Sequence, residues 1–313
     1  MVDPVRAVVI SDIEAARERI AGTVLRTPLV RFDDNIFLKL ENLQPTNAYK
    51  IRGAANAVAS LSDEARARCV WTVSAGNAGQ GVGYAARAFG IPCTVVAIET
   101  APQTKLDRMR ALGATIVPVS YDDAWAACEA HAFEGMDGTF IHPFDNHEFI
   151  AGHGTMGLEI LEDCPNVRTV ICAIGGGGLI SGVGSAIKAR RPEAKVLGAE
   201  PETAAPFALS RAEGGPRKFT DWQPSFVDGA GGKSVTERMW QRMQPVTDGT
   251  ITVTLGQTRR AMRLIAEKSR TIAEGAGALS LAAALVEEVE GPVVCVVSGG
   301  NIDLAKFAEL VAA

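Results

Sequence analysis

The sequence predicts an α/β protein made of two doubly wound lobes, each with a mainly parallel sheet. Three observations support this prediction. The chain has 313 residues, enough for about two domains at roughly 150 residues each. From Val70 onward, short β-branched runs alternate with helical stretches, which is typical of parallel strands joined by crossover helices. The alternation occurs twice, and the second set of elements begins after Asn146.

The first set of elements makes one compact lobe. Its buried strands are expected at 70–74, 93–98, 115–120 and 139–144. Its helices are expected at 78–89, 104–112 and 122–133. In the second of these helices, Leu106, Met109 and Leu112 share one face because they recur at helical spacing.

The second set makes a larger lobe. Its strands are expected at 169–174, 195–200, 251–254 and 293–298, with helices between them and a closing helix over 304–311. Residues 1–68 contain a strand candidate at 37–43 and a helix from about Thr46, and they suit either lobe. We assign them to the larger one. This gives a discontinuous large domain, 1–68 plus 147–313, and a small domain, 69–146.

Composition and charge exclude several classes of protein. The net charge of −5 indicates no nucleic-acid-binding surface. The longest charge-free stretch, 169–187, contains six glycines and is therefore not expected to span a membrane. The N-terminus has Asp3 where a signal peptide needs positive charge, so we expect a cytoplasmic protein. The six scattered cysteines, without a CxxC motif, are expected to be reduced.

Four consecutive glycines, Gly175, Gly176, Gly177 and Gly178, follow a predicted strand and begin a predicted helix over 179–188. Bare backbone amides at a helix N-terminus bind phosphate, and a tight turn alone would need only one or two glycines. A dinucleotide site is the competing interpretation, with Glu200 at the end of the next strand as the ribose-binding acid. The spacing GxGxxG fails in every register, which favours the phosphate of a smaller ligand.

A second loop with binding potential lies between a predicted strand end and a helix start. It consists of small and amide residues: Ser74, Ala75, Gly76, Asn77 and Ala78. Exposed N–H groups and an amide side chain suit a substrate carboxylate. An ordinary Asn helix cap explains the same pattern equally well.

Two further positions suit a cofactor. Lys50 follows Tyr49 and precedes the small residues 53–55, a context that can desolvate the amine and lower its pKa for imine formation. Taken without that context, Lys50 would be an ordinary surface charge. Ser298 begins the motif SGGN after a predicted strand, where a hydroxyl can meet a ring nitrogen; a simple strand-to-helix turn is the alternative.

The glycine-rich segment 211–234 is the least regular part of the chain. Gly229, Gly231 and Gly232 suit a loop at the edge of a ligand site, although a plain surface loop is an equal alternative.

Five motifs in order over residues 27–303 resemble those of the serine/threonine dehydratases, pyridoxal phosphate enzymes of the tryptophan synthase β type: QPTNAYKIRGA, SAGNAGQG, GGGGLISG, EGAGA and SGGN. The resemblance implies that the cofactor lies in the cleft between the lobes. It implies that Lys50 carries the cofactor covalently, that Gly175–Gly178 hold its phosphate, and that Asn77 meets its ring hydroxyl. Ser298 would meet the pyridine nitrogen, with Tyr49 and Glu274 near the ring. Glu274 could equally cap the helix 275–286.

Departures from the dehydratase pattern concern the substrate side. Many dehydratases have His at the position of Ala78 and Gln at the position of His153. We therefore expect both residues to contact substrate, with a partly protonated His153 able to pair with an acidic β-substituent. Serine racemases resemble the chain too, but they have a second serine where Ala75 stands, so we expect little racemisation.

The metal site of those racemases matches Glu200 and the Ala204 carbonyl, whereas its aspartate aligns with Pro206. A divalent cation is therefore a disfavoured second cofactor.

The sequence as a whole predicts a pyridoxal phosphate-dependent dehydratase, or ammonia-lyase, that removes water from a β-hydroxy amino acid and yields a 2-oxo acid and ammonia. Threonine, serine, 3-hydroxyaspartate and phenylserine are the candidate substrates. A β- or γ-replacement enzyme like threonine synthase or cysteine synthase is the first alternative, and a catalytically idle binding protein is the second. We expect a homodimer or another homo-oligomer.

Overall fold

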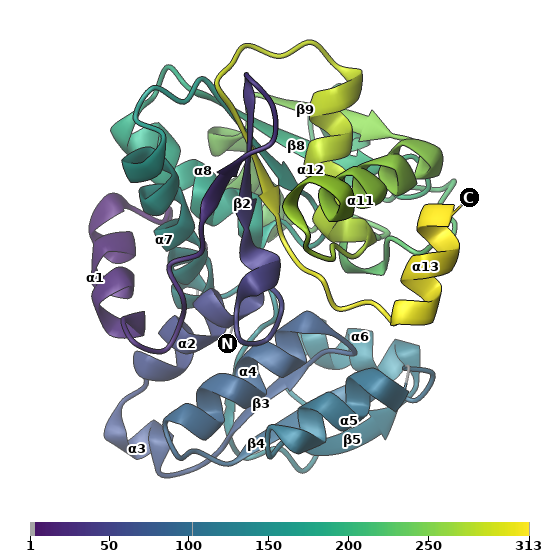
Figure 1. Ribbon diagram of the computed structural model, residues 1–313. Helices are drawn as coiled ribbons and strands as arrows, with labels where there is room; N and C mark the ends of the chain where they lie inside the picture. Colours follow the sequence, from purple (N-terminus) through teal and green to yellow (C-terminus); the bar gives the residue numbers. More distant parts are fainter. Residues whose placement is uncertain (1–3, 102, 313) are drawn as a thin grey trace.

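The computed structural model describes residues 4–101 and 103–312 and contains two mostly parallel sheets (Figure 1). The larger sheet has six strands in the order β1-β2-β10-β7-β8-β9. All its pairings are parallel except the one between β1 and β2. The strand bounds are β1 Leu29–Arg31, β2 Ile36–Leu40, β7 Thr169–Ala173, β8 Lys195–Pro201, β9 Gly249–Val253 and β10 Val293–Val297. The α/β prediction with two doubly wound lobes is confirmed.

The second sheet has four parallel strands in the order β5-β4-β3-β6. Its elements are β3 Val70–Val73, α4 Asn77–Ala88, β4 Cys93–Ile98, α5 Gln103–Ala111, β5 Thr115–Val119, α6 Tyr121–Ala130 and β6 Thr139–Phe140. The expected strand 139–144 is wrong beyond Phe140. Pro143 has no N–H for a sheet ladder, and the His142 ring accepts hydrogen bonds from the Phe144 and Asp145 amides, which turns the chain away.

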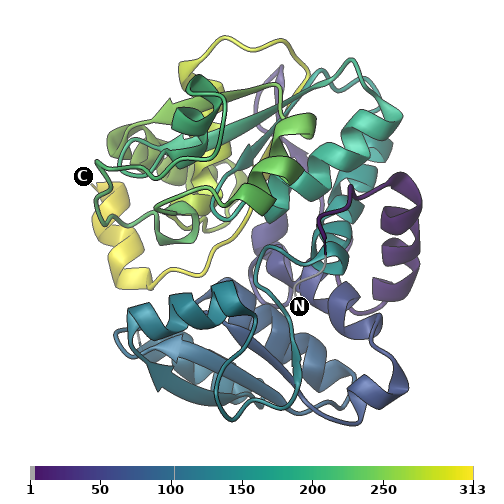
Figure 2. The same cartoon turned by 180° about the vertical axis from the view of Figure 1, so that it is seen from behind.

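Helices cover both faces of the six-stranded sheet (Figures 1 and 2). The helices of the larger lobe are α1 Ile10–Ile20, α7 His147–Asp163, α8 Gly178–Arg190, α9 Pro206–Ala212, α10 Glu237–Met243, α11 Leu255–Ser269, α12 Gly275–Val286 and α13 Leu304–Ala312. Alternate residues of β10 point into two cores: Val294 and Val296 pack with α7 and α8, whereas Val293, Cys295 and Val297 pack with α11 and α12. A parallel strand buried on both faces accounts for the unbroken apolar run in the sequence.

Helix α2 (Lys50–Ala59) lies between the lobes, and the short α3 (Asp63–Arg66) follows it. Ala54, Ala55, Ala57 and Val58 belong to the same hydrophobic core as the four-stranded sheet. On its other side α2 touches α7 so closely that a Cβ on Gly152 would overlap the Arg52 carbonyl. Residues 50–58 thus pack with both lobes, so the expected domain limits stay a prediction.

A buried ion cluster fixes α2 to the larger lobe. The Arg52 guanidinium donates to both oxygens of Glu41 and both oxygens of Glu159, over 2.7–2.9 Å. Lys39 donates to Glu159 at 2.5 Å. Burial alone would favour the neutral acid, but the Arg52 charge holds the pKa of Glu41 below its ordinary value. The cluster sets the position of α2, and Lys50 is the first residue of that helix.

Two further properties bear on the sequence predictions. All six cysteines are free thiols, five of them buried. Across the described ranges, no helix combines the length and apolarity needed to cross a bilayer. The described residues also include short 3-10 helices at Glu41–Leu43, Asp228–Ala230 and Gln244–Val246.

Candidate active site

Lys50 begins α2 at the junction of the two lobes. Its half-buried Nζ donates a hydrogen bond to the Pro143 carbonyl at 2.6 Å. Within residues 4–101 and 103–312 it forms no ion pair. Desolvation lowers the pKa of Lys50 to about 8. The unprotonated amine, which a nucleophile or base requires, is therefore more populated near neutral pH than it is for a solvated lysine.

The segment that carries Lys50 is bound to the SGGN motif at the end of β10. The Tyr49 amide donates to the Ser298 carbonyl at 3.0 Å, and the Gly300 amide donates to the Asn47 carbonyl at 2.9 Å. Ser298 itself is buried, and its hydroxyl lies 3.4 Å from the Ala276 carbonyl. The structure thus brings Lys50 and Ser298 together, although 248 positions separate them in the sequence.

The four glycines form a tight cradle between β7 and α8. Gly177 adopts φ +88°, a conformation that favours glycine. A Cβ on Gly176 would overlap the Phe144 ring, and one on Gly175 would lie 2.9 Å from the Gly229 carbonyl oxygen. Because the first amides of a helix have no partners within it, the start of α8 presents N–H groups to an anion.

Asn77, the first residue of α4, takes part in a hydrogen-bonded chain across the lobes. Its Nδ2 donates to Glu274 Oε1 at 2.7 Å, and its Oδ1 accepts from Asn301 Nδ2 at 2.8 Å. Arg108 on α5 donates in turn to Asn301 Oδ1 at 2.6 Å. The Glu274 side chain makes no capping bond to α12, so its partner is Asn77 rather than the helix it precedes. Burial, reinforced by the Asp228 charge, raises the pKa of Glu274 to about 7.

The loop proposed for a substrate carboxylate lies at the carboxyl end of β3. Residues 74–77 are half-buried, and the Gly76 amide donates to Ser74 Oγ at 3.1 Å. Ala78 is buried, 5% exposed, in the first turn of α4. The loop therefore places small residues and an amide side chain beside Asn301 and Glu274, and its role toward substrate stays a prediction.

His153 does not have the charge state expected of it. It is 0% exposed on α7, between the rings of Tyr49 and Phe149 at centroid distances of 4.6 and 4.9 Å. Neither ring nitrogen has a hydrogen-bond partner in the described part of the chain. Burial, together with the charges of Lys50 and Arg52, holds the pKa of His153 well below its ordinary value. The expectation of a partly protonated His153 is wrong, because the surrounding side chains exclude water from the ring.

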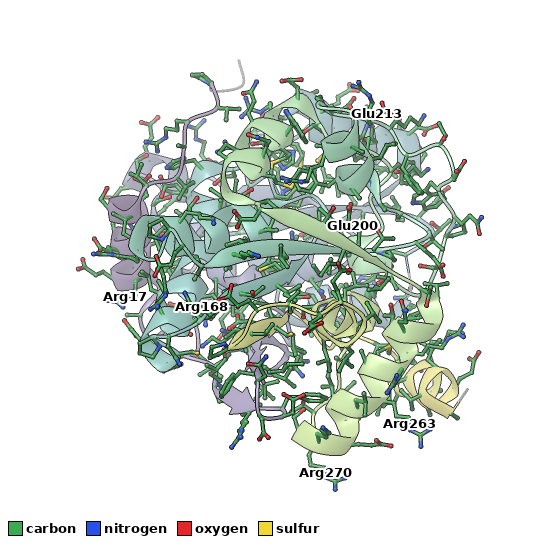
Figure 3. The ribbon with its side chains drawn as sticks, turned by 90° about the horizontal axis from the view of Figure 1, so that it is seen from above. Arg17, Arg168, Glu200, Glu213, Arg263 and Arg270 are labelled. Atoms are coloured by element: carbon green, nitrogen blue, oxygen red, sulfur yellow. The ribbon has the colours of Figure 1, made fainter. Side chains whose placement is uncertain are left out.

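Glu200 has two backbone partners that the sequence did not reveal. Its carboxylate accepts hydrogen bonds from the Phe207 and Ala208 amides at the start of α9, at 2.9 and 2.7 Å. Figure 3 shows Glu200 inside the outline of the molecule, whereas Arg17, Arg263 and Arg270 lie near the edge of the view. Burial raises the pKa of Glu200 to about 7. No group of three or more His, Cys, Asp or Glu suited to a metal occurs among the residues described, and Ala204 is 1% exposed.

Three site residues were missed by the sequence reasoning: Pro143, whose carbonyl accepts from Lys50; Phe144, which packs on the glycine cradle; and Arg108. For Pro143 a signal existed, because proline in the interior of a predicted strand argues against the strand. Arg108 gave no signal, since a lone arginine on a helix face is ordinarily solvated.

These features together fit pyridoxal phosphate: a desolvated lysine amine, a glycine cradle for a phosphate and a buried hydroxyl beside them. The family model "Pyridoxal-phosphate dependent enzyme" matches residues 20–299. The chain belongs to the pyridoxal-phosphate dependent enzymes. Lys50, Gly175–Gly178 and Ser298 are the residues that would hold the cofactor, and the roles of the individual residues stay predictions.

Several similar proteins are named as threonine ammonia-lyases, dehydratases or deaminases. The chain is 39% identical over 308 residues to an L-threonine ammonia-lyase of Thermotoga maritima, covering 95% of this chain and 76% of that protein. Among solved structures, the threonine deaminase from T.th. is similar with a TM-score of 0.87 and 34% identity, over 95% and 99% of the two chains. Maize serine racemase is similar with a TM-score of 0.89 and 33% identity, over 97% of both.

Proposed function

We propose that the protein is a pyridoxal phosphate-dependent dehydratase that converts a β-hydroxy amino acid into a 2-oxo acid and ammonia. The observation that supports it best is the desolvated Lys50 amine, which directly follows Tyr49, whose amide donates to the Ser298 carbonyl of the SGGN motif. The relatives named threonine ammonia-lyase and threonine deaminase support the same reaction.

The bound cofactor supplies an electron sink for the charge that develops at Cα. Lys50, as a neutral amine, accepts the Cα proton, and the Pro143 carbonyl orients that amine through its 2.6 Å hydrogen bond. The amides at the start of α8 would hold the phosphate. Ser298 would offer the cofactor ring a neutral hydroxyl in place of a carboxylate, so the protein would not keep that ring protonated.

The overall change balances as loss of water followed by hydrolysis. The Cα–H and Cβ–O bonds break, so water leaves, and water then replaces the nitrogen at Cα, which leaves as ammonia. No oxidant or added nucleophile enters this sequence. A β- or γ-replacement enzyme would instead require a second substrate, which separates the two functions experimentally.

Racemisation is a second candidate function. The observation that favours it is the similar fold of maize serine racemase. Ala75 argues against it. The half-buried Ala75 follows Ser74 in the loop before α4 and provides no hydroxyl for a second acid or base.

We also propose a homo-oligomer, with a homodimer as the first expectation, and a cytoplasmic location. Exposed apolar side chains such as Leu25 and Leu43, 51% and 41% exposed, support an interface between copies. Light scattering of the purified holoenzyme tests the assembly.

A coupled oxo-acid assay tests the dehydratase function. The holoenzyme, without any added nucleophile, is expected to release equal amounts of oxo acid and ammonia from at least one β-hydroxy amino acid among threonine, serine, 3-hydroxyaspartate and phenylserine. Release that depends on an added thiol or other nucleophile would identify a replacement enzyme instead.

A further inference from the structure

A pocket of about 880 Å³ adjoins the phosphate-binding glycines, and its volume lies in the usual range for small-molecule sites. Its wall includes Gly175 and Gly176 of the cradle together with Tyr121 and Trp125 of α6. One cavity therefore joins the cofactor side of the larger lobe to a helix of the smaller lobe.

A continuous path of contacts leads from the glycine cradle to the aromatic side chains. A Cβ on Gly232 would lie 3.7 Å from the Gly175 carbonyl oxygen, so the glycine turn 229–232 lies against the cradle. The Trp222 Nε1 donates to the Gly231 carbonyl at 2.9 Å, which holds the indole beside this turn. The glycine-rich segment 211–234 is thus the edge of a ligand-sized cavity.

Lys233 connects the two aromatic walls of the pocket. Its Nζ lies 4.5 Å from the ring centroid of Tyr121 on α6 and 4.5 Å from that of Trp222 in the larger lobe. Such a cation held between two rings stabilises their relative position. The pocket therefore has aromatic side chains fixed on both lobes.

Two of the aromatic residues are unusually exposed to solvent. Tyr121 is 48% exposed and Trp125 is 36% exposed. A large aromatic surface left in water at the wall of a cavity is typical of a binding site. Phe144, which packs on Gly176, adds a fourth ring to the same wall.

The charges of the pocket wall disfavour a second carboxylate on the substrate. Lys218 and Lys233 are outnumbered there by Asp122, Glu129 and Glu237. The net negative charge of the wall would repel a β-carboxylate but would not repel an uncharged ring.

We propose that these four residues, Tyr121, Trp125, Phe144 and Trp222, form an aromatic pocket for the β-substituent, so that the substrate is a β-hydroxy amino acid with an aryl ring on its β-carbon. This inference rests on the proposed dehydratase function, in which the reacting Cβ lies at the cofactor whose phosphate the glycine cradle would hold. Ring stacking and edge contacts with the aromatic pocket would stabilise an aryl substrate relative to an alkyl one.

Two measurements on the holoenzyme test the proposal. The kcat/KM for oxo-acid release from threo-phenylserine is expected to exceed that from threonine by about tenfold or more. L-Phenylalanine carries the ring but no β-hydroxyl, so it cannot lose water. By calorimetry it is expected to bind about tenfold more tightly than L-2-aminobutyrate, its aliphatic counterpart.

Paired variants separate aromaticity from size. Trp125→Leu is expected to lower the phenylserine-to-threonine ratio about fivefold or more, while Trp125→Phe keeps it within about twofold. Trp125 is 36% exposed and lies outside the hydrophobic cores formed by the described residues, so the melting temperature of each variant reports whether the fold stays intact.

Equal or better use of threonine, or a preference for 3-hydroxyaspartate, would overturn the aromatic pocket while leaving the dehydratase function standing. Absence of oxo acid from every hydroxy amino acid would overturn the dehydratase function. In that event the calorimetric comparison still tests whether the aromatic pocket binds an aryl ring. Tighter binding of L-phenylalanine than of L-2-aminobutyrate would support the aromatic pocket, and equal binding would reject it.

Discussion

The Glu274 carboxylate accepts a hydrogen bond from the Asn77 side-chain amide at 2.7 Å, although 197 positions separate the two residues. Asn77 begins a helix of the four-stranded lobe, and Glu274 precedes α12 of the six-stranded lobe. The contact therefore joins the lobes at the site where the cofactor hydroxyl is expected. Asn77 keeps a second Nδ2 proton, so it can bind Glu274 and a ligand oxygen together.

This contact predicts a pH dependence of stability. The pKa of Glu274 is raised from 4.5 to about 7 by burial first and by Asp228 second. The folded apoprotein therefore holds a proton that the unfolded chain has lost, and stability falls as pH rises from about 4.5 to about 7. Glu274→Gln is expected to make this fall shallower in urea unfolding of the apoprotein. Glu237→Gln, an exposed control, should leave the slope unchanged, and an unchanged slope for Glu274→Gln would contradict the prediction.

Lys50→Ala tests the role of the amine. Oxo-acid release is expected to fall by about a factor of 10³ or more, because the base that takes the Cα proton is lost. Borohydride reduction followed by peptide mapping should place the pyridoxyl label on Lys50 in the parent enzyme and nowhere in the variant. The melting temperature should change little, since the Lys50 amine makes one hydrogen bond, to the Pro143 carbonyl. A label on another lysine would reassign the site.

Much of the fold follows from local patterns in the sequence. The strand 93–98 and the helix 275–286 have the expected bounds, because a β-branched run and an alanine-rich stretch each specify one local structure. Lys50, the glycine quartet and Ser298 were proposed as site residues from their motifs, since phosphate binding and close backbone approach demand rare residue types.

Side-chain partners could not be found in this way. The Arg52 cluster joins residues from the 3-10 helix Glu41–Leu43, α2 and α7, and no local spacing relates Glu41 to Glu159. His153 was misjudged for the same reason: its pKa depends on the rings of Tyr49 and Phe149, which only the packing of α2 against α7 brings together. The aromatic pocket needed the structure too, because Trp125 and Trp222 lie on different lobes.

The Arg52 cluster predicts a large loss of stability on substitution. Arg52→Met is expected to lower the free energy of unfolding by about 3–5 kcal/mol, because it leaves the buried Glu41 and Glu159 carboxylates without the guanidinium that pairs with both. Arg17→Met is a matched control on the surface, where Arg17 pairs with a half-exposed Glu162, and should cost at most about 1 kcal/mol. If guanidinium unfolding showed that Arg52→Met and Arg17→Met lower the free energy of unfolding equally, the Arg52 cluster would stabilise the fold no more than a surface ion pair does.

The side chain of Ala75 has no group that could act as a second acid or base, and we therefore expect racemisation to be slow. Without a hydroxyl at this position, the release of oxo acid from L-serine is expected to exceed the appearance of D-serine by about tenfold or more, measured by chiral chromatography. Ala75→Ser should increase the D-serine fraction, since a hydroxyl returns to the loop before α4. Comparable rates of racemisation and elimination in the parent enzyme would refute the assignment of Ala75.

The surroundings of Ala78 and His153 predict different effects when each residue is replaced. We expect one replacement to change substrate ratios and the other to change the melting temperature. Ala78→His adds an imidazole in the first turn of α4, beside Asn77, and is expected to lower the phenylserine-to-threonine ratio of kcat/KM. His153→Gln replaces a neutral ring that packs on Tyr49, so it should lower the melting temperature without changing the use of 3-hydroxyaspartate.

The double variant, assayed on threonine, serine, 3-hydroxyaspartate and phenylserine, should therefore follow Ala78→His in its substrate ratios. A shift of less than about tenfold, or ~1.4 kcal/mol, across that panel would show that neither residue selects the substrate. A larger effect of His153→Gln on 3-hydroxyaspartate than on threonine would restore a charged role for His153.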